Sequence, residues 1–137
     1  MRRLLVAVIA VCSLVLPFGQ ASAARWEPHQ RCPQWEWLFR KHKLPVRTFS
    51  YIAWREARCR PTAQNARWRD GKIIWTLNRN GTYDSGLLQI NSSWVTVTSQ
   101  VCKSKFGDLK VLLDPQCNVA VGAYLYFEGG GLRNWSM

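Results

Sequence analysis

The chain has 137 residues, of which 47% are hydrophobic and 20% charged, and its formal net charge is +11. This length suits one domain with a modest core. The strong positive charge implies an anionic partner, but the basic residues are scattered and carry no signature of an RNA- or DNA-binding module, so we expect no nucleic-acid partner.

The first residues have the features of an export signal. Arg2 and Arg3 precede an uncharged apolar run, residues 4–16, and Ala21-Ser22-Ala23 forms a small-residue cleavage site. An uncleaved membrane anchor is the alternative, but the run is shorter than the roughly 20 residues that span a bilayer. We therefore assign residues 1–23 to a signal peptide and 24–137 to one secreted domain, with no stable membrane insertion after cleavage.

Cleavage before Ala24 removes 23 of the 137 residues and leaves 114, with a charge of +9 and four cysteines. An even number of cysteines in a small exported domain indicates disulfides, here two. Three pairings are possible, and we favour Cys32–Cys59 with Cys102–Cys117 because each closes a local loop. A metal site is the alternative, but no CxxC or HxxxH spacing supports it, so we expect no metal and no cofactor.

Two helices are predicted in the first half of the domain. Residues 33–42 place Trp35, Leu38 and Phe39 on one apolar face, and Pro33 suits a first helical turn. A second helix covers residues 48–59 and ends before Pro61, which cannot continue it.

The pattern then changes to that of a small antiparallel sheet. Asp70-Gly71 and Asn80-Gly81 are hairpin-turn signals, and the segment between them, residues 72–77, is rich in β-forming residues. Gly86 is expected to open a helical stretch over residues 87–94, and a buried helix is expected over residues 114–127. The predicted fold class is α+β: a mostly helical domain with the small sheet flanking a cleft.

Two carboxylates with contrasting surroundings are the main candidates for chemistry. Glu56 shares a helical stripe with Phe49, Ile52 and Ala53, where an acid is costly to ionise and suited to donate a proton. Asp84 lies among polar and turn residues, where it should stay ionised. Such a pair suits cleavage of glycosidic bonds. The alternatives are that Glu56 is a surface acid paired with Arg60 and that Asp84 is a turn residue.

Residues 78–92, NRNGTYDSGLLQINS, resemble the sheet-turn-helix segment of chicken-type lysozymes and the related segment of soluble lytic transglycosylases. With Glu56 before it and Asp114-Pro115 and Asn118 after it, the resemblance to this lysozyme-like superfamily covers over half of the secreted domain. Its members cleave the β-1,4 bond between N-acetylmuramic acid and N-acetylglucosamine in peptidoglycan. The interval between Glu56 and Asp84 is longer than in chicken-type lysozymes, and residues 60–76 hold the additional residues.

The resemblance implies a role for several residues. Glu56 matches the general acid and Asp84 the second carboxylate of chicken-type lysozymes. Four further residues match positions that contact or border the sugar: Asn78 near the second carboxylate, Gln89 and Asn91 beside the cleft, and Trp94 as an aromatic wall.

The sequence thus predicts a secreted, monomeric, peptidoglycan-cleaving glycosidase whose partner is the glycan strand. One alternative is a lytic transglycosylase, in which the 6-hydroxyl of the substrate attacks and a 1,6-anhydro product forms. Two others are a non-catalytic cell-wall-binding module and a cationic antimicrobial protein that acts on membranes. No long amphipathic basic helix supports the last of these.

Overall fold

The computed structural model describes residues 29–69, 72–75 and 77–137, and for residues 66–69 and 72–75 it describes the backbone alone. The predicted signal peptide, residues 1–23, lies outside these ranges. The fold is α+β and mostly helical, as the sequence predicts. The order of elements is η1 (Pro33–Trp35), α1 (Glu36–Lys41), α2 (Val46–Ala57), β1 (Ala66–Arg69), β2 (Lys72–Trp75), β3 (Asp84–Ser85), β4 (Ile90–Asn91), η2 (Ser92–Trp94), α3 (Val95–Cys102), η3 (Leu109–Leu113), α4 (Pro115–Phe127) and η4 (Gly131–Trp135), where η denotes a 3-10 helix.

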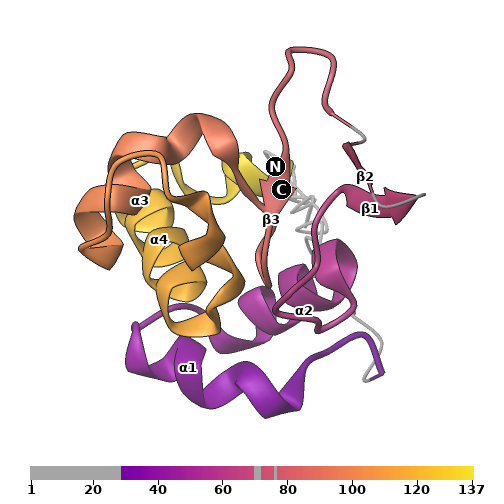
Figure 1. Ribbon diagram of the computed structural model, residues 1–137. Coiled ribbons are helices and arrows are strands. Elements are labelled where there is room, and N and C mark those ends of the chain that lie inside the picture. Colours follow the sequence, from indigo (N-terminus) through magenta and orange to yellow (C-terminus); the bar gives the residue numbers. More distant parts are fainter. Residues whose placement is uncertain (1–28, 70–71, 76) are drawn as a thin grey trace, which may run out of the picture.

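The strand β3 lies between the helices and the β1–β2 hairpin, as Figure 1 shows. Helices α1 and α2 lie together at the bottom of that view, α3 and α4 lie side by side at the left, and the β1–β2 hairpin stands at the right. Helix α4 packs against α1, α3 and η4, so it connects the first helices to the C-terminal turn. Asp114 caps α4 by accepting a hydrogen bond from the backbone N–H of Gln116 (2.9 Å), and Pro115 occupies the first turn.

Phe49 of α2 occupies the centre of the core. Its ring centroid lies 6.2 Å from that of Phe39, 5.4 Å from that of Tyr126 and 5.2 Å from that of Trp135. Phe39 and Phe49 are fully buried, and Trp135 is 5% exposed. Edge-to-face and tilted contacts of this kind add to the free energy gained by burial alone. The aromatic cluster therefore fixes α1, α2, α4 and the C-terminal turn relative to one another.

The strands form two separate antiparallel pairs. β1 pairs with β2 in a register that runs from Ala66 opposite Trp75 to Arg69 opposite Lys72, which confirms antiparallel pairing around the first turn signal. The turn residues themselves, Asp70-Gly71, lie outside the described residues. The second turn signal forms a turn, in which Gly81 N–H donates to the carbonyl of Asn78 (2.8 Å). However, β3 pairs with β4 and not with β2. The β1–β2 hairpin therefore lies within the additional segment, and Asp84 belongs to the second pair.

The predicted helix over residues 87–94 is wrong. Residues 86–89 form a turn, and β4, η2 and the start of α3 follow it. Gly86 (φ +80°) and Gln89 (φ +48°) both adopt the left-handed conformation, which cannot continue a right-handed α-helix. A tertiary hydrogen bond also intervenes, because the backbone N–H of Leu88 donates to the buried side chain of Asn118.

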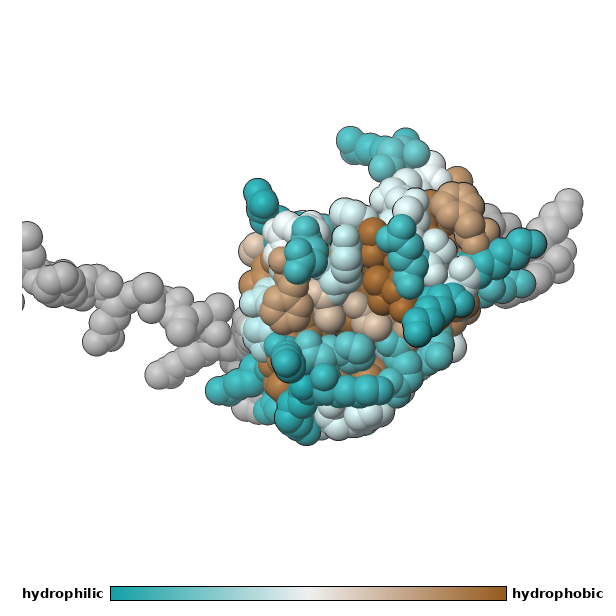
Figure 2. All heavy atoms as spheres, turned by 90° about the vertical axis from the view of Figure 1, so that its left-hand side faces the viewer, coloured by the Kyte–Doolittle hydropathy of each residue, from teal (hydrophilic) through white to brown (hydrophobic). Residues whose placement is uncertain are grey.

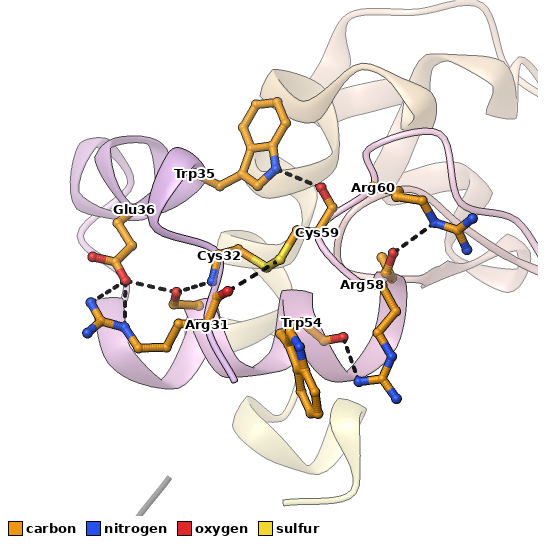
Figure 3. The surroundings of a disulfide bond; sticks show 10 residues. Arg31, Cys32, Trp35, Glu36, Trp54, Arg58, Cys59 and Arg60 are labelled. Carbon is orange, nitrogen blue, oxygen red and sulfur yellow. Dashed lines mark hydrogen bonds and ion pairs between the residues drawn. A yellow bond between two sulfur atoms is a disulfide. The ribbon is translucent and has the colours of Figure 1, made fainter. Parts of the chain in front are cut away.

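Both favoured disulfides are present, Cys32–Cys59 and Cys102–Cys117. The first ties the entry to η1 to the residues that follow α2, and Figure 3 shows it beside the indole of Trp35, which donates to the Cys59 carbonyl (2.9 Å). Two disulfides are compatible with an oxidising compartment. Within the described residues, none of the helices combines the length and apolarity needed to cross a bilayer.

The surface on the side of α1, α3 and α4 is mixed in character. Figure 2 shows hydrophilic residues along its lower border, where α1 lies, with apolar residues gathered above them. Large exposed apolar side chains elsewhere on these helices include Trp37 of α1 and Phe127 of α4. Because polar residues interrupt the apolar ones, this face resembles ordinary protein surface.

A buried carboxylate stabilises the junction between α1 and α2. Glu36, 8% exposed, accepts hydrogen bonds at Oε1 from the Arg31 guanidinium (Nε 2.9 Å, and also Nη2) and from the Ser50 hydroxyl (2.9 Å). Ser50 in turn accepts from the backbone N–H of Cys32 (2.8 Å). Burial by itself raises the pKa of Glu36, but the hydrogen bonds from Arg31 and Ser50 and the charges of Arg31 and Arg40 outweigh it, so the pKa lies below the ordinary value.

We expect Glu36→Gln to lower the free energy of unfolding by about 1–3 kcal/mol near neutral pH, because charge-assisted hydrogen bonds are lost. A carboxyl whose pKa is lowered by folding stabilises the protein above its unfolded-state pKa, and this contribution is lost as the pH falls through the folded-state pKa. Denaturant unfolding should show that the parent and Glu36→Gln differ less in free energy of unfolding at about pH 2.5 than at about pH 7. Glu128→Gln, at an exposed position, is the control. A loss of unfolding free energy in Glu36→Gln that stays constant with pH would contradict this interpretation.

Candidate active site

Glu56 lies where the core-facing stripe of α2 reaches the protein surface. Phe49, Ile52 and Ala53 on this stripe are fully buried, as the helical spacing predicts. The Glu56 side chain follows them and is 28% exposed. The carboxylate is therefore at the margin of the core and not inside it, and it can reach both solvent and a bound ligand.

Arg55 is the ion-pair partner of Glu56. Its Nε and Nη2 donate to Glu56 Oε1 at 2.8 and 2.6 Å, and Nη2 also donates to the carbonyl of Trp135. The alternative partner, Arg60, instead directs its Nε to the carbonyl of Ala57. Among the described residues no group donates to Glu56 Oε2, so this oxygen is available to a ligand.

The C-terminal turn η4 forms one wall of the site and is held in place by hydrogen bonds. The indole Nε1 of buried Trp135 donates to the carbonyl of Leu88 (2.9 Å), which anchors η4 to the turn before β4. Asn134 Nδ2 donates to the carbonyls of Gly129 (3.1 Å) and Gly131 (3.0 Å). These bonds order a tail that follows three consecutive glycines.

Asp84 is surrounded by amide groups, which agrees with the polar surroundings that the sequence predicts. Asn78 Nδ2 donates to its Oδ2 (3.0 Å), and Asn91 Nδ2 donates to its Oδ1 (2.7 Å). The backbone N–H of Asp84 donates to Asn65 Oδ1 (2.9 Å). Hydrogen bonds to both carboxylate oxygens fix the orientation of this side chain.

Asn78 and Asn91 hold Asp84 through a shared network. Both amides donate to the hydroxyl of Thr82, at 3.0 and 2.9 Å, as well as to Asp84. Asn91 Oδ1 also accepts from the backbone N–H of Ser93 (3.0 Å) and so caps η2. The side-chain nitrogen and oxygen of Asn91 are thus already engaged with the protein. Its observed contacts position the second carboxylate, whereas contact with the sugar stays a prediction.

Gln89 and Gly86 shape the turn beside Asp84. Gln89 Nε2 donates to the carbonyls of Ala63 (3.0 Å) and Gly86 (2.8 Å), so the amide also has a structural role. A Cβ atom at Gly86 would lie 2.1 Å from both Asn118 Nδ2 and the carbonyl oxygen of Leu112. Only glycine fits there. Left-handed backbone at a non-glycine residue such as Gln89 is costly and is often found at functional sites.

These elements enclose a cleft with two adjacent parts. The larger is a cavity of about 440 Å³, within the range of small-molecule sites, and the smaller measures about 160 Å³. Both are lined by Asp84, Gln89, Asn134 and Trp135. The larger part adds Arg55, Glu56 and Ser136, and the smaller adds Ile90, Asn91, Trp94 and Leu125.

The structure brings most of the predicted site residues together. Glu56, Asp84 and Gln89 line the larger part, and Asn91 and Trp94 line the smaller. Asn78 contacts the site through Asp84. Four lining residues were not predicted from the sequence: Arg55, Asn134, Trp135 and Ser136. A signal for Trp135 was available, since tryptophan is highly buried on average.

The described residues contain no group of three or more histidine, cysteine, aspartate or glutamate side chains placed to hold a metal ion. No protein-family model matches the chain, and no curated protein is significantly similar to it in sequence.

Proposed function

We propose that the chain is a secreted peptidoglycan-cleaving glycosidase of the lysozyme-like superfamily, which acts on the β-1,4 bond between N-acetylmuramic acid and N-acetylglucosamine. The observation that carries this proposal is that Glu56 and Asp84, 28 positions apart in the sequence, line one cavity. One carboxylate borders the apolar core and the other is surrounded by amides. A pair of carboxyl groups in different surroundings is what glycosidases use to separate the acid from the anion.

In the proposed reaction Glu56 donates its proton from Oε2 to the glycosidic oxygen as the bond from that oxygen to the anomeric carbon breaks. Asp84 stabilises the positive charge that develops on the sugar, or bonds to the anomeric carbon. Water then attacks this carbon, and Glu56 takes the proton that the water releases. Retention of configuration is expected if the carboxyl groups act at a separation of about 5 Å.

Arg55 has a defined place in this scheme. Its guanidinium donates to Oε1 of Glu56 and so orients the carboxyl group, while Oε2 is the oxygen that gives and takes the proton. The first step requires the acid form, and we expect a glycan in the cavity to shift the guanidinium toward the Trp135 carbonyl that it already contacts.

The proposal is tested by incubating the purified secreted domain with purified peptidoglycan and analysing the soluble fragments. Fragments with new reducing ends are expected. Fragments with 1,6-anhydro ends would make the protein a lytic transglycosylase, in which Asp84 is secondary. Binding without release of any fragment would overturn the enzymatic proposal and leave a cell-wall-binding module.

A further inference from the structure

The outward face of α2 carries a row of cationic and aromatic side chains. Arg47, Tyr51 and Trp54 follow one another at spacings of four and three residues, which places them on one side of the helix, and Arg58, the residue after α2, lies against Trp54. We call them the α2 outer stripe. The two arginines are exposed, and the two aromatic residues are half-buried.

Stacking orders the guanidinium at the end of this stripe. The rings of Tyr51 and Trp54 stack, with centroids 6.1 Å apart and planes inclined by 24°. The Arg58 guanidinium carbon lies 4.0 Å from the Trp54 centroid, and Figure 3 shows the two side chains next to each other, away from the disulfide. Stacking uses the flat face of a guanidinium and leaves its in-plane N–H groups free to bind a carboxylate through two parallel hydrogen bonds.

Among the described residues, few of those N–H groups have a partner. Arg58 Nη1 makes one long contact with the carbonyl of Trp54 (3.4 Å). The ion pairs found among the described residues are Arg31–Glu36 and Arg55–Glu56, so neither Arg47 nor Arg58 is paired with an acid there. Within the part of the chain that the structure describes, the positive charge of the stripe is therefore not compensated by an acid, and one donor is held in place before a ligand binds.

The backbone at Arg58 gives independent support. Arg58 (φ +50°) and Cys59 (φ +62°) both adopt the left-handed conformation after α2, where helices commonly have glycine. The Cys32–Cys59 disulfide and the bond from Trp35 to the Cys59 carbonyl hold this turn. An arginine at such a position costs stability relative to glycine. The stacking contact with Trp54 offsets this cost, and the held turn fixes the position from which the guanidinium extends.

The α2 outer stripe lies next to the candidate active site. Arg55 lines the larger cavity beside Glu56, and its guanidinium carbon lies 6.0 Å from the Tyr51 ring centroid. A polymer in the cavity would thus meet the stripe next to Arg55. In peptidoglycan, the glycan strand carries peptides that end in carboxylates.

We propose that the α2 outer stripe is a second binding site that recognises the peptide carboxylates of the peptidoglycan strand held in the cavity, with Arg58 as the main donor. The identity of the polymer rests on the proposed function. The stripe would make the protein prefer peptide-bearing strands to bare glycan.

The test compares two soluble ligands: glycan strands that bear peptides, and the same strands after an amidase has removed them. Binding is measured in a Glu56→Gln background, so that cleavage does not interfere. Arg58→Gly should weaken binding of peptide-bearing strands by about tenfold and that of bare glycan by less than about twofold. Arg58→Lys, which keeps the charge but loses the planar donor pair, should lose most of the preference.

Lys103→Gly is a matched control, because Lys103 is exposed and also occupies a left-handed position at the end of a helix, α3. It should leave the affinities for peptide-bearing strands and for bare glycan within about twofold of those of the parent. Equal losses in Arg58→Gly and Lys103→Gly would show an effect of net charge only and overturn the inference, as would an Arg58→Gly variant that binds peptide-bearing strands normally. Tighter binding of anionic lipid vesicles than of strands would also overturn it.

The outcomes separate this inference from the proposed function. If the protein binds neither kind of strand, the proposed function fails. If it binds both kinds equally well and cleaves them, only the role of the stripe fails. Thermal unfolding of Arg58→Gly should match that of the parent, because the relaxed backbone offsets the lost stacking.

Discussion

Glu56→Gln is expected to reduce peptidoglycan cleavage by about 10²–10⁴-fold, the usual contribution of a general acid. Glutamine has nearly the same shape as glutamate, and its Oε1 can still accept a hydrogen bond from Arg55. It has no proton of suitable acidity to give to a leaving oxygen. The loss should therefore fall on the rate of the chemical step, while binding of the glycan strand is largely kept.

The control for this variant is Glu128→Gln, which removes the same charge from an exposed residue at the end of α4. It should cleave peptidoglycan at the wild-type rate. Thermal unfolding of both variants establishes that they fold. A well-folded Glu56→Gln variant that retains more than about a tenth of the wild-type rate would contradict the assignment of Glu56 as the acid.

Asn118→Ala is expected to have the largest effect on stability, a loss of about 3–5 kcal/mol in the free energy of unfolding. Asn118 is fully buried on α4. Its Nδ2 donates to the carbonyls of Ser85 (2.9 Å) and Leu112 (3.0 Å), and its Oδ1 accepts from the backbone N–H of Leu88 (2.8 Å). Truncation removes three hydrogen bonds to backbone groups and also creates a small cavity.

The same change should affect activity beyond its effect on folding. Asn118 joins the end of β3 to the turn that carries Gln89, so its loss would loosen two sides of the cleft. We expect the activity per folded molecule to fall as well. Denaturant unfolding measures the first effect, and rates under conditions that keep the variant folded measure the second.

Gln116→Ala is the control on the same helix. Its amide oxygen accepts from Lys41 (3.0 Å) at an exposed position, so its loss should cost less than about 1 kcal/mol. An Asn118→Ala variant no less stable than Gln116→Ala would show that the buried bonds do not anchor the cleft.

Local sequence signals were sufficient to predict the elements whose ends are marked by capping, proline or glycine residues. Pro115 and the capping Asp114 fix the start of α4, and the run of glycines follows its end. The two short cysteine loops indicate the observed disulfides. At the start of α4, the interactions that decide the structure are between residues close together in the chain.

Tertiary contacts explain what the sequence pattern could not show. The sequence of residues 87–90 favours a helix. Its backbone is instead fixed by the hydrogen bond between the Leu88 N–H and Asn118, 30 residues further along the chain. The partner of Glu56 is Arg55, although adjacent helical residues do not usually face each other. The C-terminal wall has no periodic pattern, and its place in the site depends on Trp135 reaching Leu88.

The most direct test of the account is digestion of purified peptidoglycan in water enriched in heavy oxygen, followed by mass spectrometry of the fragments. Hydrolysis by the wild type should place one heavy oxygen at each new reducing end, and Glu56→Gln should yield almost no labelled fragments. Two results would contradict the assignment of Glu56 as the acid that hydrolyses glycan in this cleft. One is that both proteins form labelled fragments at equal rates, and the other is that well-folded wild type does not cleave.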